Sequence, residues 1–279
     1  MSIGRKILDK VSMPISYASS YVRSLKYGDE LFRDPKTFCM FIGYPRSGHS
    51  IVGALIDAHP DAVVSHELDV LKFIRAGFSK RQIFTMILRT SEGYARRGRV
   101  ARDYTYRVPN QWHGRFRNLR VIGDKKGPGS MNKLRDDLKL TDRLQKTTGT
   151  DIRYIHVIRN PYDTISTISR RSQKKLTKCS KQYFSLCRTV MAVKKQLEPS
   201  SVLDMRHEAL IADPESELTK ICLFLGLEPR EDYLRDCASI LYSSPHKSRC
   251  EVQWSDGLIR MVKEEMAEIP FLEGYSFEE

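Results

Sequence analysis

The sequence has no long hydrophobic run: no segment approaches the roughly 18–20 apolar residues that a membrane-spanning helix needs. Residues 1–28 also lack the compact apolar core of a secretory signal peptide. These absences argue against helical membrane spans and predict a cytoplasmic location. The same segment is basic and poor in acids, which suits either peripheral contact with a membrane surface or a basic helix, residues 1–30, packed on its own domain. Four of its apolar residues stand at helical spacing: Ile3, Ile7, Leu8 and Val11.

Closely spaced cysteine pairs are also missing. None of the six cysteines forms a C-x-x-C pair, so we expect no zinc site. Several cysteines lie in apolar helical contexts, such as Cys222. We interpret them as reduced packing residues, which suits a reducing compartment.

Acidic residues are in the minority, with 34 Asp and Glu against 47 Lys and Arg, a net charge of +13. This surplus favours anionic partners: a nucleotide, a sulfated or carboxylated substrate, nucleic acid or an acidic membrane surface. The length of 279 residues and the hydrophobic content of 41% suit one large domain with a substantial core.

Internal repeats and low-complexity segments are absent as well, and short apolar runs alternate with stretches of helical period. Strands are predicted at 37–43, 119–123, 153–158 and 201–206, and helices at 49–58, 68–76, 79–96, 130–146, 161–173, 178–196, 214–225 and 256–267. Strands separated by helices predict a single three-layer α/β domain over residues 1–279, with a central parallel sheet. Residues 97–118 fit no element and are interpreted as a loop or insertion.

A glycine-rich turn follows the first predicted strand: residues 43–50 read Gly-Tyr-Pro-Arg-Ser-Gly-His-Ser. The spacing G-x-x-x-x-G-x-[ST] is that of a Walker loop, in which backbone amides and a helix N-terminus hold phosphate. The candidate phosphate-binding residues are Arg46, Ser47, Gly48, His49 and Ser50. His49 stands where a Walker loop has Lys, and no Walker B aspartate is evident, so a Mg²⁺-dependent kinase or ATPase would be poorly equipped. The alternative is an ordinary tight turn.

A second basic cluster begins where the strand at 153–158 ends, with Arg159 followed by Asn-Pro. Ligands of parallel sheets lie beyond such carboxyl ends. One face of the next helix brings Thr167 and then Arg170 or Arg171 towards Arg159, which predicts a second anion site. A solvated basic helix start is the alternative.

Together these segments resemble the PAPS-dependent sulfotransferases, most closely the tyrosylprotein, carbohydrate and bacterial enzymes. Residues 43–50 resemble their 5′-phosphosulfate loop, and Arg159 through Thr167 resembles their 3′-phosphate motif, an Arg followed eight residues later by a hydroxyl. Residues 204–227 are similar to their arginine–aromatic–Glu segment and the helix after it. The resemblance spans about 37–275 and implies PAPS as donor, PAP as product and metal-free in-line sulfuryl transfer to a hydroxyl or amine.

Two residues depart from the family pattern. His49 stands where Thr is usual, which removes one side-chain contact to the 5′-phosphate, and Thr167 stands where Ser is frequent. Ser166 is an alternative to Thr167 for that contact.

The resemblance also indicates catalytic residues. Arg46 suits the leaving-group side because its planar cation fits phosphate oxygens. Lys125 lies in a segment like the Gly-acid-Lys of these enzymes, and Lys126 could replace it; the alternative for both is surface charge.

Glu67 is the predicted base, since a Glu stands at this distance after the loop in tyrosylprotein and related sulfotransferases. We expect a closed site to raise its pKa towards the working range. His66 is the rival, because imidazole titrates near neutrality. On a strand the two would face opposite ways, so only one is expected to face the donor.

The segment from Pro245 to Trp254 resembles the late segment that closes over the nucleotide. Lys247 and Arg249 are candidates for 3′-phosphate contact, whereas Trp254 is interpreted as core packing.

The acceptor is left open by the sequence. Residues 89–120 hold nine arginines and two acids, with aromatic residues interleaved. They could bind an acidic glycan or sulfated acceptor, bind nucleic acid, or form a solvated basic face. We favour a carbohydrate or other small acidic acceptor, with 97–118 as the acceptor-side insertion, over a nucleic-acid partner. A metal-dependent NTPase, a basic nucleic-acid-binding protein and a PAP-binding protein without catalysis remain the alternatives.

Overall fold

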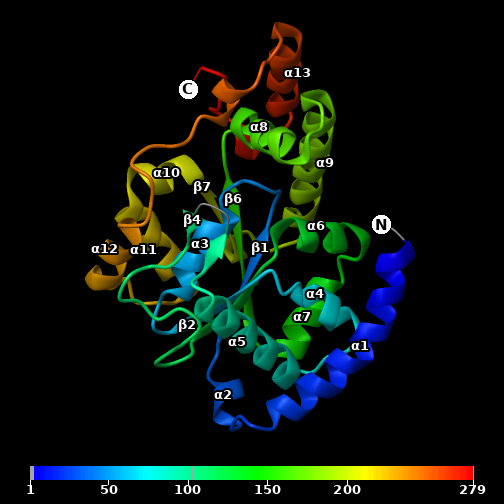
Figure 1. Cartoon of the computed structure of the whole chain (residues 1–279), viewed down its shortest axis with the longest axis vertical. Helices are drawn as coiled ribbons and strands as arrows, with labels where there is room; N and C mark the ends of the chain where they lie inside the picture. Colours follow the sequence, from blue (N-terminus) through cyan, green and yellow to red (C-terminus); the bar gives the residue numbers. More distant parts are fainter. Residues whose placement is uncertain (1–2, 102–103, 279) are drawn as a thin grey trace.

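The computed structural model describes residues 3–101 and 104–278, which form one α/β domain around a five-stranded parallel sheet. The strand order is β2-β5-β1-β6-β7 (Figure 1). The strands are β1 (Thr37–Ile42), β2 (Ala62–His66), β5 (Val121–Lys125), β6 (Asp151–Ile158) and β7 (Val202–Arg206). A separate two-stranded ribbon pairs β3 (Val100–Ala101) with β4 (Tyr104–Thr105).

The central strand β1 is apolar at successive positions because both of its faces are buried. Phe38, Met40 and Ile42 pack into the core on one face of the sheet. Cys39 and Phe41 pack into the core on the other. Since side chains alternate along a strand, a strand covered on both sides needs apolar residues at every position.

Helices cover both faces of the sheet and complete three layers (Figure 1). One layer contains α4 (Val70–Arg75), α5 (Lys80–Arg96), α6 (Gly127–Asp136), α7 (Leu140–Thr148) and the end of α9 (Leu176–Lys194). The opposite layer contains α3 (His49–Asp57), α10 (His207–Ala212), α11 (Pro214–Leu225) and α12 (Glu231–Ala238). The predicted three-layer α/β fold is therefore confirmed.

A third apolar cluster lies beyond the carboxyl ends of the strands, at the top of Figure 1. It is built from α8 (Pro161–Ser172), the start of α9, α13 (Asp256–Ala267) and the short turn η3 (Pro270–Leu272). Tyr44, directly after β1, is fully buried in it. This cluster fixes α8 above the edge of the sheet, where the second basic segment begins.

The N-terminal helix α1 (Ile3–Ser24) packs along α5, and the short α2 (Glu30–Arg33) follows it. Gln82 of α5 donates to the Tyr17 carbonyl (3.0 Å) and to the Ser20 hydroxyl (3.2 Å). The predicted packing of a basic helix on its own domain is thus seen over this part of α1. The apolar residues at 3, 7, 8 and 11 lie outside the part of the chain whose side chains are described. In the described ranges, no helix has both the length and the apolar character needed to cross a bilayer.

The region 97–118 is tied to the domain by one buried carboxylate. Asp57, at the end of α3, forms an ion pair with the buried Arg99 and accepts the backbone N–H of Gly114 at 2.9 Å. It also accepts the Ser91 hydroxyl of α5 at 2.6 Å. The Asp57 carboxylate thus links α3 and α5 to Arg99 and Gly114 of this region.

Secondary-structure prediction misses several short elements, although it finds β5 and β7, which have 5 residues each. The predicted helix at 130–146 is wrong as one element, because Asp137 is extended (φ −157°, ψ 92°) and separates α6 from α7. The strand β2 and the helices α10 and α12 were not among the predicted elements; they have only 5, 6 and 8 residues. Periodicity needs a longer window to be visible.

Candidate active site

The ends of all five parallel strands lie at one edge of the sheet, and a cavity of about 770 Å³ opens above them. The chain leaves β1 into residues 43–48 and leaves β5 at Lys125. It leaves β2 at His66, β6 just before Arg159, and β7 at Arg206. The parallel topology therefore brings the separately predicted segments to a single edge, as expected for an open parallel sheet.

The loop between β1 and α3 has the backbone of an anion cradle. Gly43 (φ 133°), Arg46 (φ 70°) and Gly48 (φ 108°) all have positive φ. At Gly48 a Cβ would stand 2.4 Å from His207, so a side chain is excluded there. Helix α3 begins directly after, and its first amides have no partners within the helix. The loop thus presents a helix N-terminus to the cavity, the arrangement that attracts phosphate.

His49 contributes shape to this loop rather than charge. Its buried ring bonds to the Ile42 carbonyl through Nε2 at 3.1 Å, which requires a proton on that nitrogen. Burial lowers the pKa of His49 to about 3, so the ring is neutral. It fills the space beside Gly43 and Gly127, where a Cβ would lie 2.9 and 2.6 Å from ring atoms. His49 therefore does not replace the cation of a Walker loop.

Lys125 extends from the end of β5 into the space between α3 and β2. Its side chain is only 3% exposed. It passes over Gly53 of α3, where a Cβ would lie 2.9 Å from the lysine Cγ. The ammonium donates to the Ser50 hydroxyl at 3.1 Å and to Glu67 at 2.5 Å. Burial lowers the pKa of Lys125, and the Glu67 carboxylate opposes that effect.

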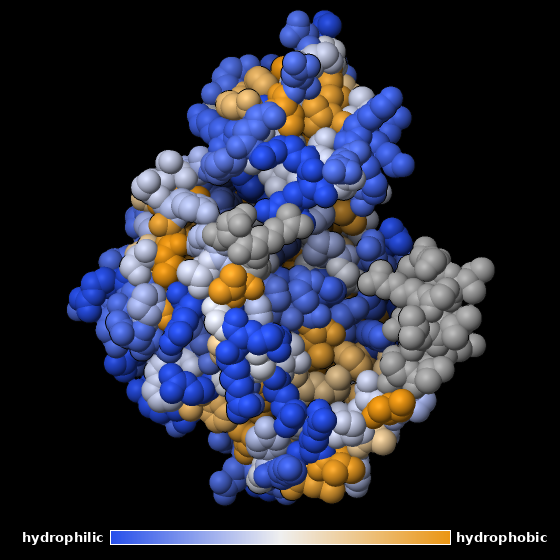
Figure 2. Space-filling model, in the orientation of Figure 1, coloured by the Kyte–Doolittle hydropathy of each residue, from blue (hydrophilic) through white to orange (hydrophobic). Residues whose placement is uncertain are grey.

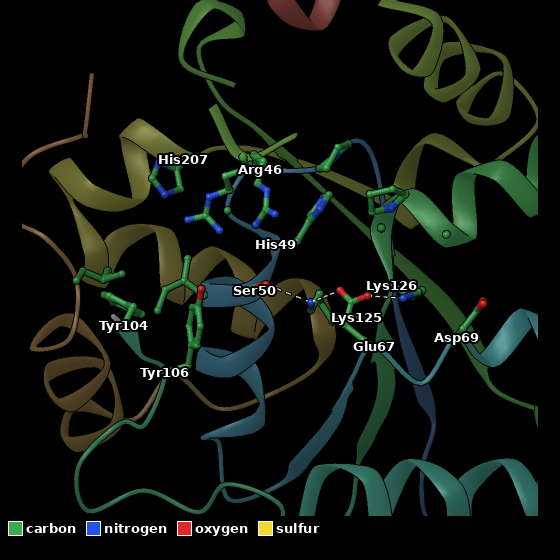
Figure 3. Close-up of a pocket in the computed structure, with 18 of the residues that line it drawn as sticks. Arg46, His49, Ser50, Glu67, Asp69, Tyr104, Tyr106, Lys125, Lys126 and His207 are labelled. Carbon is green, nitrogen blue, oxygen red and sulfur yellow. Dashed lines mark hydrogen bonds and ion pairs between the residues drawn. The ribbon is translucent and has the colours of Figure 1, made fainter. Parts of the chain in front are cut away.

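Glu67 is held by two lysines, with Lys125 on one carboxylate oxygen and Lys126 on the other, each at 2.5 Å (Figure 3). Burial raises the pKa of Glu67, but the lysine charges and hydrogen bonds outweigh burial and lower that pKa to about 2. The expectation of a raised pKa is wrong for this state, because the neighbouring cations dominate over the closed surroundings. The carboxylate is ionised and oriented towards the cavity.

His66 lies on the other side of the chain from Glu67. Its ring stacks on Tyr94 of α5, with centroids 4.4 Å apart and planes 17° from parallel. It does not line the cavity, whereas Glu67 does. Burial, followed by the charge of Lys125, lowers the pKa of His66 to about 4. The two neighbours face opposite ways, and Glu67 is the one at the cavity.

A strained turn aims two carboxylates into the cavity. Glu67 (φ 65°) and Asp69 (φ 68°) are both left-handed, which is uncommon for residues with a side chain. The buried Asp124 holds this turn from beneath by accepting the N–H groups of Leu68 (3.1 Å) and Val70 (2.9 Å). Sequence reasoning missed Asp124, although it directly precedes Lys125. Backbone strain that is fixed in this way is typical of functional sites.

Arg159 connects the second basic segment to the first. Its guanidinium donates to the carbonyl of Arg46 at 3.4 Å and to that of His246 at 2.6 Å. A third contact reaches the Ser248 hydroxyl at 3.4 Å. Arg159 therefore adjoins the loop at Arg46, although it is not among the residues that line the cavity.

Ser248 joins Arg159 to Thr167. The Thr167 hydroxyl lies 3.0 Å from the Ser248 hydroxyl, and the His246 Nδ1 lies at the same distance from it. Ser248 begins the short turn η2 (Ser248–Glu251), which packs on α8. Sequence reasoning missed Ser248 because only the charges of Lys247 and Arg249, on either side of it, drew attention. The Thr167 hydroxyl predicted beside Arg159 would have been the signal to look for a second hydroxyl there.

Three other residues predicted to contact the nucleotide, Ser166, Arg249 and Lys247, do not join this hydrogen-bonded group. Ser166 is buried and accepts the Trp254 indole N–H at 3.1 Å, so its hydroxyl is engaged in packing. Arg249 is buried in an ion pair with Asp163 at 2.6 Å, which fixes η2 to α8. Lys247 is exposed.

The two arginines at the end of α8 also diverge. Arg171 lines the cavity together with Arg46. Arg170 instead forms an ion pair with Glu251 of η2. The helical face predicted from Arg159 thus delivers one of the two arginines to the site.

The cavity has two unlike sides, separated by the loop and the start of α3 (Figure 3). One side is lined by rings and aliphatic side chains, with Arg46 and Arg171 near Tyr106: Tyr104, Tyr106, His207, Ile211, Leu241 and Tyr242. The other is charged: Glu67, Asp69, Lys72, Lys125, Lys126 and Lys133. In the described part of the chain, no group of three or more His, Cys, Asp or Glu is arranged to hold a metal ion.

Comparison with known proteins agrees with this architecture. A family model described as the sulfotransferase family matches residues 39–232. No curated protein matches the chain. The sulfotransferase domain from the curacin biosynthetic pathway is 14% identical, with a TM-score of 0.53 over 85% of this chain and 98% of that one. Sulfotransferase STF9 from Mycobacterium avium is 12% identical, with a TM-score of 0.52 over 95% of this chain and 82% of that one. Structural likeness at these identities concerns the fold.

Proposed function

This chain belongs to the sulfotransferase family, and we propose that it transfers a sulfuryl group from PAPS to a hydroxyl or amine without a metal. One observation carries the choice of donor: the guanidinium of Arg159 contacts the backbone of Arg46. Two anion-binding segments therefore adjoin, and PAPS carries anionic groups at both ends of one nucleoside. ATP has no 3′-phosphate for the second segment.

The donor has a natural orientation in the cavity. Its phosphosulfate lies at the start of α3, near Arg46 and Ser50, and its 3′-phosphate lies at Arg159, Thr167 and Ser248. Its adenosine then follows the ring-lined side, where aromatic faces suit a base. This places Tyr104 and Tyr106, from the region predicted to be acceptor-side, against the nucleoside instead.

His207 suits the adenosine side for a second reason. Burial, followed by the charge of Arg159, lowers the pKa of His207 to about 4, so its ring is neutral. Its buried Nδ1 has no hydrogen-bond partner among the described residues. In the tautomer with its proton on Nε2, the Nδ1 of a neutral imidazole accepts a hydrogen bond from an amino group such as that of adenine.

The reacting atoms lie beside Lys125 and Glu67. Glu67 takes the proton of the acceptor hydroxyl while the acceptor oxygen bonds to sulfur. The bond from sulfur to the bridging oxygen breaks, and PAP leaves with the electron pair. Lys125 and Arg46 stabilise the charge that grows on the bridging oxygen, since fixed cations in a water-poor site act strongly there.

The low pKa of Glu67 fits this scheme if donor binding redistributes its partners. Lys125 already contacts Ser50 at the start of α3. A phosphosulfate there competes with Glu67 for the ammonium. Weakening of that ion pair raises the pKa of Glu67 and makes it a better base at the moment when the acceptor is in place.

Calorimetry with three nucleotides tests the donor assignment. PAP should bind at least tenfold more tightly than adenosine 5′-phosphate, because only PAP fills both anion segments. PAP should also bind more tightly than Mg-ATP. Tighter binding of Mg-ATP, or equal affinity for PAP and adenosine 5′-phosphate, would contradict the proposal.

A further inference from the structure

The charged side of the cavity holds more positive than negative groups. Four lysines line it against two carboxylates: Lys72, Lys125, Lys126, Lys133, Glu67 and Asp69. Lys126 and Lys133 are partly exposed, with 27% and 22% of their side chains accessible. They are therefore reachable by a molecule in the cavity.

Asp69 offers an unused acceptor on this side. One carboxylate oxygen bonds to the Lys133 ammonium at 2.7 Å. The other is buried and has no hydrogen-bond partner among the described residues. A buried carboxylate oxygen without a donor costs free energy, and a ligand hydroxyl would supply the missing hydrogen bond.

Glycines at the start of α6 bring Lys126 into place. A Cβ at Gly129 would stand 2.9 Å from Cε of Lys126, and one at Gly127 would stand 2.6 Å from His49. Both glycines line the cavity. The missing side chain at Gly129 leaves room for the Lys126 stem, whose ammonium reaches Glu67, and the missing side chain at Gly127 leaves room for the His49 ring.

We propose that this charged side binds the acceptor, and that the acceptor is an acidic oligosaccharide. The inference rests on the proposed function, which places the donor on the opposite, ring-lined side. Lys126 and Lys133 bind carboxylate or sulfate groups of the acceptor. Asp69 accepts a hydrogen bond from one of its hydroxyls, and Glu67 faces the hydroxyl that is sulfated.

The composition of this side argues against an apolar acceptor. The tyrosines and the leucine of the cavity lie on the ring-lined side, together with Ile211. A phenol or sterol against Lys126, Lys133 and Asp69 would desolvate charges without pairing them, which is unfavourable. Figure 2 shows hydrophilic residues interspersed with smaller hydrophobic patches over this face of the molecule.

Binding to PAP-saturated protein tests the inference directly. The probes are tetrasaccharides of chondroitin, heparin and polygalacturonate, a carboxyl-reduced chondroitin tetrasaccharide, and 4-nitrophenol. At least one acidic tetrasaccharide should bind, and acidic chondroitin should bind at least tenfold more tightly than its reduced form. Failure of all three acidic probes, equal binding of the reduced form, or tighter binding of 4-nitrophenol would overturn the inference.

Matched variants locate the binding. Lys133→Gln and Lys126→Gln should each weaken binding of the acidic tetrasaccharide at least fivefold and leave the affinity for PAP unchanged. Lys146→Gln, at an exposed position of α7, removes the same charge and should have no effect. An equal loss in Lys146→Gln would show general charge attraction and overturn the assignment to this side. Loss of PAP binding by the unmodified protein would instead contradict the proposed function, so the two failures are distinguishable.

Discussion

The two segments that we propose bind the anionic ends of the donor are built in different ways. The loop at residues 43–50 is local: eight consecutive residues supply the glycines, the cation and the helix N-terminus. The Arg159 segment is assembled from the end of β6, from α8 and from η2, and its Thr167–Ser248 hydrogen bond joins residues 81 positions apart. The first lies beside Glu67 and Lys125, and the second lies away from them. Changes near the first should therefore alter turnover, and changes in the second should alter nucleotide affinity.

The largest effect is expected from Glu67→Gln. Loss of the base should reduce turnover by about 10²-fold or more and leave PAP affinity within a factor of about three. Radiolabelled PAPS with an accepted substrate measures the first quantity and calorimetry the second. If His66→Ala abolishes turnover and Glu67→Gln does not, the base is His66. The assignment of catalysis to Glu67, beside the first segment, is then wrong.

Arg159→Ala should weaken the binding of PAP at least tenfold, which is about 1.4 kcal/mol. Adenosine 5′-phosphate should lose little affinity in the same variant, because it has no 3′-phosphate. Titration calorimetry on both nucleotides separates a lost phosphate contact from a disturbed loop. Unchanged PAP affinity in a folded variant would remove Arg159 from the donor site.

Ser248→Ala should have a smaller effect of the same kind. The loss of one hydroxyl contact costs about 0.5–1.5 kcal/mol. The affinity for PAP should therefore fall roughly threefold to tenfold. Ser166→Ala is the matched control, since that hydroxyl bonds to Trp254. A greater loss of PAP affinity in Ser166→Ala than in Ser248→Ala would reverse the two assignments.

The smallest predicted effect is a pH dependence of stability. Glu67→Gln leaves the buried Lys125 without its main counter-charge, so the lysine pKa in the folded state falls further below its unfolded value. Between those two pKa values the unfolded chain binds more protons, and the folded state gains stability as pH rises. The difference in Tm between the variant and the unmodified protein should therefore shrink from pH 7 to pH 10. A constant or growing difference in thermal melts would contradict the role of Lys125 as a buried cation.

The same contrast explains what the sequence could predict. The loop at 43–50 was visible because its geometry depends on adjacent residues, and apolar runs in β1 and β6 predicted the buried sheet. Ser248 and Asp124 were not visible, because each acts on a residue that only folding brings near. The role of His49 depends on burial against the Ile42 carbonyl, which a sequence does not show.

The choice between Glu67 and His66 shows the limit most clearly. Alternation along a strand predicts that only one of the two neighbours faces the donor. Which one does so depends on the left-handed backbone at Glu67 and Asp69, and that turn is held by Asp124 from another strand. Intrinsic preferences of Glu and Asp give no sign of it, since both favour other conformations.

A crystal structure of the protein with PAP tests most directly whether one nucleotide joins the two segments. We expect the 5′-phosphate at the start of α3 within hydrogen-bond distance of Ser50, and the 3′-phosphate in contact with Arg159 and Ser248. A nucleotide that occupies the loop while its 3′-phosphate points into solvent, with Arg159 still bonded to the His246 carbonyl, would contradict the account.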